Sequence, residues 1–211
     1  MCFSAHISFI VAGGLALTGL LSVIISKNRY ELLLSLTPFI FAIQQAIEGI
    51  LWIALPAHPL VASVATYSYL CFAYLFWPIW IPLAIACYEP EFWRKLVIFS
   101  SMLIGIILAG TFLKLMIIQG ATSSIKSHHI VYSMNITSLW LGILLNLSYF
   151  MAVVAPFFIS SRAALWMFGA AISISYVVIQ IGYYAFSASL WCFAAATISG
   201  MIVYSIAKNQ P

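Results

Sequence analysis

Long apolar runs dominate this chain and restrict what it can fold into. Hydrophobic residues make up 65% of the 211 positions and charged residues only 6%, whereas soluble domains carry about 25% charged residues. The runs reach about 18 residues or more, the length at which a helix can cross a bilayer. A membrane β-barrel would instead show alternating segments of about 10 residues, and that pattern is missing. The sequence therefore predicts an all-α, polytopic membrane bundle.

Short polar breaks separate seven such runs, and no linker divides them into domains. The longest break expected is the loop from Gly120 to His129. Pro78 and Pro82 in the third run remove two backbone donors and predict a kink near the middle of the membrane. We expect a single integral membrane domain over residues 1–211. The expected transmembrane helices span roughly 5–26, 31–54, 60–87, 93–118, 134–159, 163–185 and 188–207.

Basic residues are distributed unevenly over the breaks. By parity one side of the membrane has only Lys126 in a loop and Lys114 near a helix end. The positive-inside rule therefore places the N-terminus outside and the C-terminus in the cytoplasm. The residues that share the cytoplasmic side are Lys27, Arg29, Arg94, Lys95, Arg162 and Lys208.

The ends and the charge add two expectations. The chain opens without a basic n-region, so no cleavable signal peptide is expected. The net charge of +4 comes from scattered residues rather than from a cluster, which gives no indication of nucleic-acid binding. The lipid bilayer is the partner that the composition predicts.

Glu48 is the most unusual residue in the apolar runs. Aspartate is absent, and the other three glutamates lie at predicted segment ends, so Glu48 is the one carboxylate expected inside the bilayer. Such a group is costly there and normally faces the bundle interior and has a partner. It could be satisfied by an internal bond to Gln180, a tyrosine or a histidine. Alternatively it is a metal ligand, a catalytic general base or a proton carrier.

Other polar side chains fall at a similar depth, in the outer half of the membrane. Helical spacing gives three polar stripes, which begin at Gln44, Ser138 and Tyr176 and include Glu48, Asn146 and Gln180. These stripes predict one polar cavity that opens outward. Its expected members, besides Glu48, are His6, Gln44, Gln45, Tyr67, Asn135, Ser138 and Gln180.

Two cysteines and two histidines lie near the same side. Cys2 and Cys192 could form a disulfide in an oxidising compartment, or could be two free thiols. His128 and His129 lie in a loop, where histidines are usually solvated. The chain has no lysine midway along its last span, which argues against a retinal Schiff base, and it lacks His-Glu-x-x-His and Gly-x-Ser-x-Gly motifs.

Three motifs resemble those of a known family. The chain opens Met-Cys-Phe-Ser-Ala, carries Glu-Gly-x-x-Trp at Glu48 to Trp52, and ends with a Trp-Cys-Phe helix at Trp191 to Phe193. The chain thereby resembles an uncharacterised bacterial family of multi-pass membrane proteins over nearly its whole length. The resemblance implies a bacterial cell (inner) membrane protein and no particular activity. It associates a small polar residue with the position of His6, which weakens His6 as a ligand.

The residues that remain suggest a metal site. Thiolate, imidazole and carboxylate are the ligand types that a divalent metal such as zinc uses. The expected ligands are Cys2, Glu48, His129 or His128, and Cys192. The corresponding function is a metal-dependent enzyme that acts on a lipid-like substrate, with Glu48 as its catalytic group, or a metal sensor.

Two alternatives stay open. One is a small transporter or receptor in which the polar stripes line a substrate path and Glu48 carries protons or binds the ligand. The other is a purely structural membrane subunit whose polar groups are bonded internally, in which case Glu48 contributes only stability.

Overall fold

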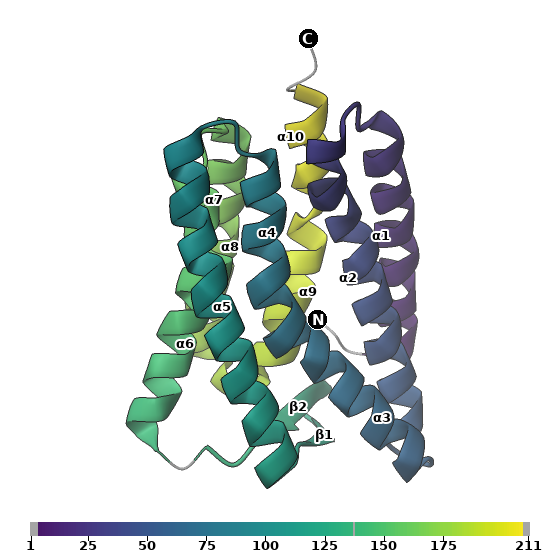
Figure 1. Ribbon diagram of the computed structural model, residues 1–211. Coiled ribbons are helices and arrows are strands. Elements are labelled where there is room, and N and C mark those ends of the chain that lie inside the picture. Colours follow the sequence, from purple (N-terminus) through teal and green to yellow (C-terminus); the bar gives the residue numbers. More distant parts are fainter. Residues whose placement is uncertain (1–3, 137, 209–211) are drawn as a thin grey trace.

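The protein is a helical bundle with one small β-hairpin (Figure 1). The computed structural model describes residues 4–136 and 138–208. Among these residues, seven helices are long and apolar enough to cross a membrane. Some of these seven spans consist of more than one helical element. The α-helices of the described residues are α1 (Ala5–Ile25), α2 (Arg29–Ala54), α3 (Pro59–Leu70), α4 (Trp77–Tyr88), α5 (Phe92–Gln119), α6 (Leu139–Val153), α7 (Ala155–Ile159), α8 (Ala163–Gly182), α9 (Ser187–Ile198) and α10 (Gly200–Lys208).

Three of the seven spans are composite helices. The third runs from Pro59 to Tyr88 through α3, a π-helical turn at Cys71–Phe76, and α4. The wide turn lies just before Pro78, the first of the two prolines at which a kink is expected. The fifth span, Leu139–Ile159, joins α6 to α7 at Val154. The seventh, Tyr184–Tyr204, joins a 3-10 turn at Tyr184–Phe186 to α9 and α10.

The segment from Gly120 to His129 was expected to be a loop. This expectation is wrong, because the segment forms the first half of a β-hairpin. Strands β1 (Thr122–Lys126) and β2 (His129–Ser133) pair antiparallel with Lys126 opposite His129. The two turn residues, Ser127 and His128, both have positive φ angles of 47° and 61°, as a tight hairpin turn requires. Since β2 extends to Ser133, the fifth span begins at Leu139 and not near residue 134.

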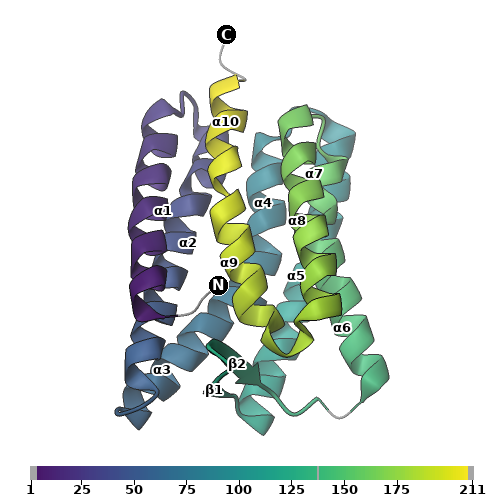
Figure 2. The same ribbon diagram turned by 180° about the vertical axis from the view of Figure 1, so that it is seen from behind.

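The connections gather at two ends of the bundle. The end that we call the hairpin end holds β1, β2, the start of α3 and the turn between α8 and α9 (Figures 1 and 2). The opposite end holds the turns between α1 and α2, α4 and α5, and α7 and α8. We call it the basic end, because its turns and the first residues of the helices that follow them include Lys27, Arg29, Arg94, Lys95 and Arg162.

Aromatic side chains fill much of the interior. Phe41 of α2 stacks on Trp77 of α4 with ring centroids 3.9 Å apart, and Tyr74 stacks on Phe112 of α5 at 4.2 Å. The Tyr149 hydroxyl of α6 donates a 2.6 Å hydrogen bond to the Ala73 carbonyl in the wide turn. The third span is thus held from three neighbouring helices, α2, α5 and α6, with a backbone acceptor satisfied inside the bundle as the low-dielectric interior demands.

Candidate functional site

Glu48 is buried in the bundle and is bonded to the last span. Its side chain has no exposed surface. Ser189 of α9 donates a 2.6 Å hydrogen bond to Glu48 Oε1, and Gln45 Nε2 lies 3.4 Å from Oε2. The expected interior position is confirmed. Ser189 was not among the expected partners, and Gln180 is not bonded to Glu48 but to another helix.

Gln44 joins α2 to α4 one turn away from Glu48. Its Oε1 accepts a 2.7 Å hydrogen bond from Trp77 Nε1. Among the described residues, Gln44 Nε2 and Gln45 Oε1 have no hydrogen-bond partner, although both residues are fully buried. Buried amide groups of this kind are expensive unless they are satisfied. The two glutamines therefore form an interior polar layer rather than the wall of an open cavity.

Cys192 lies beside this layer, on the α9 face that it shares with Ser189. The Cys192 thiol is buried and is a free cysteine. The side chains of Tyr69 and Gln44 lie next to it. Tyr69 stacks on Tyr132 of β2 with ring centroids 4.6 Å apart and nearly parallel planes. The hairpin thus covers the hairpin end of the interior through an aromatic pair.

The expected metal ligands are not gathered into one site in the part of the chain that is described. Nowhere in residues 4–136 and 138–208 do three or more His, Cys, Asp or Glu side chains form a group that could hold a metal. His128 is exposed at the hairpin turn. His129 packs against Phe186 with ring centroids 4.6 Å apart, and burial lowers its pKa. Cys2 lies outside the described residues.

The remaining members of the expected polar cavity are dispersed. His6 and Asn135 are exposed. The Tyr67 hydroxyl accepts a 3.1 Å hydrogen bond from the Ala121 amide, so it holds the hairpin. Ser138 caps α6 through the Leu141 amide at 3.3 Å. Of this set, Ser138 and Gln180 are the two residues that line the pocket described next.

A cavity lies between α5, α6, α8, α9 and β2, and we call it the α6–α8 pocket. Its volume is about 810 Å³. Asn146 of α6 accepts hydrogen bonds at Oδ1 from the Tyr176 hydroxyl (3.1 Å) and from Gln180 Nε2 (3.3 Å), both of α8. The predicted stripes on these two helices therefore meet. The α2 stripe with Gln44 and Glu48 does not line the pocket, which corrects the expectation of one shared cavity.

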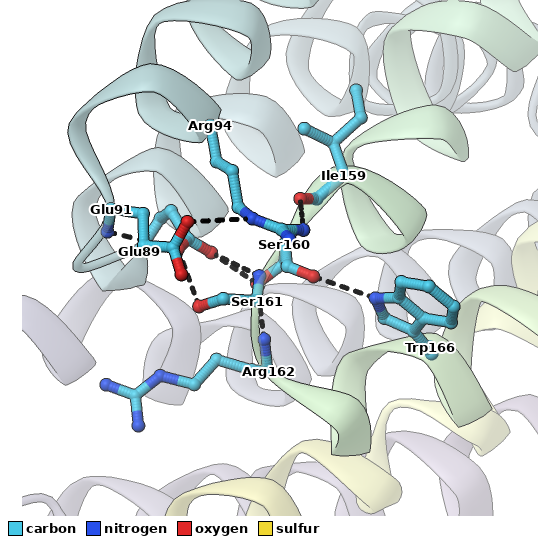
Figure 3. A network of polar contacts seen from close by, with 8 residues as sticks. All are labelled: Glu89, Glu91, Arg94, Ile159, Ser160, Ser161, Arg162 and Trp166. Carbon is cyan, nitrogen blue, oxygen red and sulfur yellow. Dashed lines mark hydrogen bonds and ion pairs between the residues drawn. The ribbon is translucent and has the colours of Figure 1, made fainter.

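A second polar cluster, at the basic end, was not predicted. Glu89 is almost completely buried between the α4–α5 and α7–α8 turns (Figure 3). Its carboxylate accepts bonds from Ser160 Oγ at 2.7 Å, Ser161 Oγ at 2.6 Å and the Ser161 amide at 2.8 Å. Burial raises the pKa of Glu89, but the bonds from Ser161 and Ser160 outweigh it and hold that pKa below its usual value.

Arg94 reinforces this cluster from α5. Its guanidinium donates to Glu91 Oε2 at 3.0 Å and to the Ile159 carbonyl at 2.8 Å (Figure 3). Trp166 of α8 donates to the Ser160 carbonyl at 2.7 Å. The donors and acceptors are matched by one another, so the geometry is that of a structural clamp between two turns. The sequence signal was present in Glu-Pro-Glu and Ser-Ser-Arg, two polar breaks on one side of the bundle.

Comparison with known proteins gives one match over the whole chain. The profile of a family of unknown function, DUF6629, matches residues 1–211. No curated protein and no solved structure matches the chain. The functional argument therefore rests on the geometry of the pocket and of the buried network.

Proposed function

Since the chain belongs to DUF6629, a family of unknown function, we propose its function from its own geometry: it is a membrane protein that binds a small amphipathic molecule in the α6–α8 pocket. Ligand sites are concave, mostly apolar and furnished with a few convergent polar groups, with volumes of about 300–1,000 Å³. The α6–α8 pocket, at about 810 Å³, meets this description.

The observation that carries the proposal is the polar wall made by Asn146, Tyr176 and Gln180. These side chains bond to one another across two helices of the bundle. The Gln180 carbonyl and the Tyr176 hydroxyl keep acceptor capacity beyond these bonds. Polar groups that face a cavity within a membrane bundle are costly and typically mark a ligand or substrate path.

Ligand binding fits the described residues better than metal-dependent catalysis does. Of the residues expected to bind a metal, Glu48 and Cys192 lie together. Neither His128 nor His129 joins them in a group that could hold a metal. Glu48 is engaged by Ser189 and lies outside the pocket wall. A receptor or carrier whose ligand meets Asn146 and Gln180 therefore replaces the enzyme as our leading proposal, and Glu48 takes the role of fixing α9 behind the pocket.

We also propose that the hairpin end faces outward and that the membrane is a bacterial inner membrane. The positive-inside rule supports this orientation, because the turns at the basic end and the helix starts beside them carry five of the eight basic residues. The pocket, which Ser133 and Ser138 border, then opens in the outer half of the membrane. A ligand would reach it from the outer leaflet or from the external medium.

The test is direct binding to purified protein in lipid nanodiscs. The probes are radiolabelled dodecanoate, dodecyltrimethylammonium and monododecanoylglycerol, which share one chain length and differ in headgroup charge. We expect saturable binding of at least one probe. Asn146→Ala should weaken this binding about tenfold, because it removes a side chain that organises the polar wall and a binding free energy of about one hydrogen bond. Asn135→Ala is the matched control, since Asn135 is exposed and outside the pocket wall. Equal binding by the two variants contradicts the proposal.

A further inference from the structure

We infer that Arg29, Tyr30 and Lys95 form a binding site for the phosphate group of an anionic phospholipid at the basic end. None of the three residues lines the α6–α8 pocket, so this inference goes beyond the proposed function and does not depend on it. Three observations carry it. They are the meeting of cations from two helices, the lack of a carboxylate that pairs with them, and the exposed apolar surface beside them.

The cations meet at the side chain of Tyr30. Arg29, the first residue of α2, donates a 3.3 Å hydrogen bond from Nη2 to the Tyr30 hydroxyl, and its guanidinium lies 5.2 Å from the centroid of the Tyr30 ring. Lys95, in the first turn of α5, lies close enough to Tyr30 to interact with it electrostatically. Two positive charges from separate spans therefore lie around one hydroxyl group.

No carboxylate in the described part of the chain pairs with Arg29 or Lys95. The three carboxylates at this end are engaged elsewhere. Glu31 accepts hydrogen bonds within the α1–α2 turn, Glu89 belongs to the clamp with the α7–α8 turn, and Glu91 forms the surface ion pair described above. An anion between the two cations would relieve their mutual repulsion, so the site favours a negatively charged ligand.

The three side chains offer hydrogen-bond donors to such an anion. The Arg29 guanidinium keeps N–H donors beyond the one that it gives to Tyr30. The Lys95 ammonium is a donor without any acceptor. The Tyr30 hydroxyl accepts from Arg29, so its own proton can be donated to a ligand oxygen. A phosphate group combines negative charge with several acceptor oxygens, and Arg and Lys are the side chains that commonly bind it.

Exposed apolar side chains beside the site indicate a lipid rather than free phosphate. Phe92 and Trp93 begin α5 just before Lys95 and are 69% and 74% exposed. Leu32 of α2 and Leu96 of α5 lie one or two positions further into their spans and are also exposed. Aromatic residues concentrate at the headgroup level of a membrane, and basic residues there attract anionic lipids. A phospholipid bound here would have apolar surface for its acyl chains below its phosphate.

The experiment measures equilibrium binding of radiolabelled dioleoylphosphatidylglycerol, which is anionic, to the purified protein in dodecyl maltoside micelles. The competitors are dioleoylphosphatidylcholine, which has the same chains and no net charge, and inorganic phosphate. We expect phosphatidylglycerol to bind about tenfold more tightly than phosphatidylcholine, and this preference to fall as the salt concentration rises. Arg29→Gln combined with Lys95→Gln should remove most of the preference. Lys27→Gln is the matched control and should keep it, because Lys27 is an exposed cation of the neighbouring turn and is not among the groups that act on Tyr30.

Thermal unfolding verifies that the variants fold, and the lipid comparison on the unaltered protein keeps the inference testable if the double variant does not. Equal affinities for the two lipids overturn the inference. An equal loss of preference in Lys27→Gln would show attraction by net charge alone and overturns the assigned site. Displacement of the bound lipid by an equimolar amount of inorganic phosphate overturns the lipid as the ligand. None of these outcomes bears on the α6–α8 pocket, whose ligand is tested separately.

Discussion

Ser189 of α9 donates a 2.6 Å hydrogen bond to the Glu48 carboxylate of α2, across 141 positions of sequence. Both side chains are completely buried. The bond fixes the first turn of α9 to the second span, and the next turn of α9 presents Trp191 and Cys192 to the α6–α8 pocket. The carboxylate thus supports the pocket wall from behind.

Ser189→Ala should destabilise the protein by about 1–3 kcal/mol, the range for a buried group that loses its hydrogen-bond partner. The measurement is reversible unfolding in detergent micelles. Ser187→Ala is the matched control, because Ser187 lies in the same turn, is half-buried and is not bonded to Glu48. A Ser189→Ala protein as stable as the Ser187→Ala protein would show that the bond contributes nothing.

Glu89 should contribute stability that depends on pH. Its pKa lies below the usual value of 4.5, so folding favours the ionised form. This stabilisation is present above about pH 4.5 and is lost as the pH falls through the lowered pKa. Glu89→Gln should therefore cost about 2 kcal/mol near neutral pH and progressively less below pH 4.

Glu91→Gln is the control for this measurement. The Glu91 side chain is 59% exposed and pairs with Arg94 on the surface, and exposed pairs contribute about 0–1 kcal/mol. Unfolding curves of both variants at several pH values give the comparison. A cost of Glu89→Gln that is the same at acidic and neutral pH would refute the assigned ionisation.

Gly105 should be required for the packing of α5 against the broken third span. A Cβ atom added there would overlap the carbonyl oxygen of Pro78, whereas one added at Gly110 of the same helix meets nothing within 4 Å. Gly105→Ala should cost about 1–3 kcal/mol through overpacking. Gly110→Ala should be neutral or stabilising by up to about 1 kcal/mol, because alanine is the better helix former. Equal stabilities would mean that the helices can separate freely at this contact.

The orientation can be tested with single cysteines introduced into a protein without its native cysteines. Ser127 lies exposed at the hairpin turn and Lys27 lies exposed at the basic end. In intact cells, a membrane-impermeant maleimide should label Ser127→Cys and not Lys27→Cys, and cell lysis should make both reactive. The reverse pattern would place the basic end outside.

Helical hydrophobicity was sufficient to predict the fold class, because each span satisfies its own backbone and needs no information from its neighbours. The hairpin was missed, since its turn uses Ser127 and His128 at positive φ rather than glycine or asparagine. Burial of Glu48 was predictable from its position within an apolar run, because a carboxylate in a membrane helix normally faces the bundle interior. Its partner was not, because Ser189 belongs to a serine-containing segment that resembles a turn in sequence.

The pocket was predictable only in part. Helical spacing identified the stripes through Asn146 and Gln180, which do meet. It also grouped Glu48 with them, because depth and helical phase do not specify which helices are neighbours. Gln44 instead bonds to Trp77 of α4. The α2 stripe, which is polar like the other two, therefore lies in the packed interior.

The central claim, that the α6–α8 pocket binds a ligand, is tested most directly by filling the pocket. Gly142 lines it, and an added Cβ meets nothing within 4 Å, as is also true of Gly110 outside it. We predict that Gly142→Leu folds and abolishes the saturable amphiphile binding in nanodiscs, while Gly110→Leu binds like the unaltered protein. Unchanged binding by folded Gly142→Leu would contradict the claim.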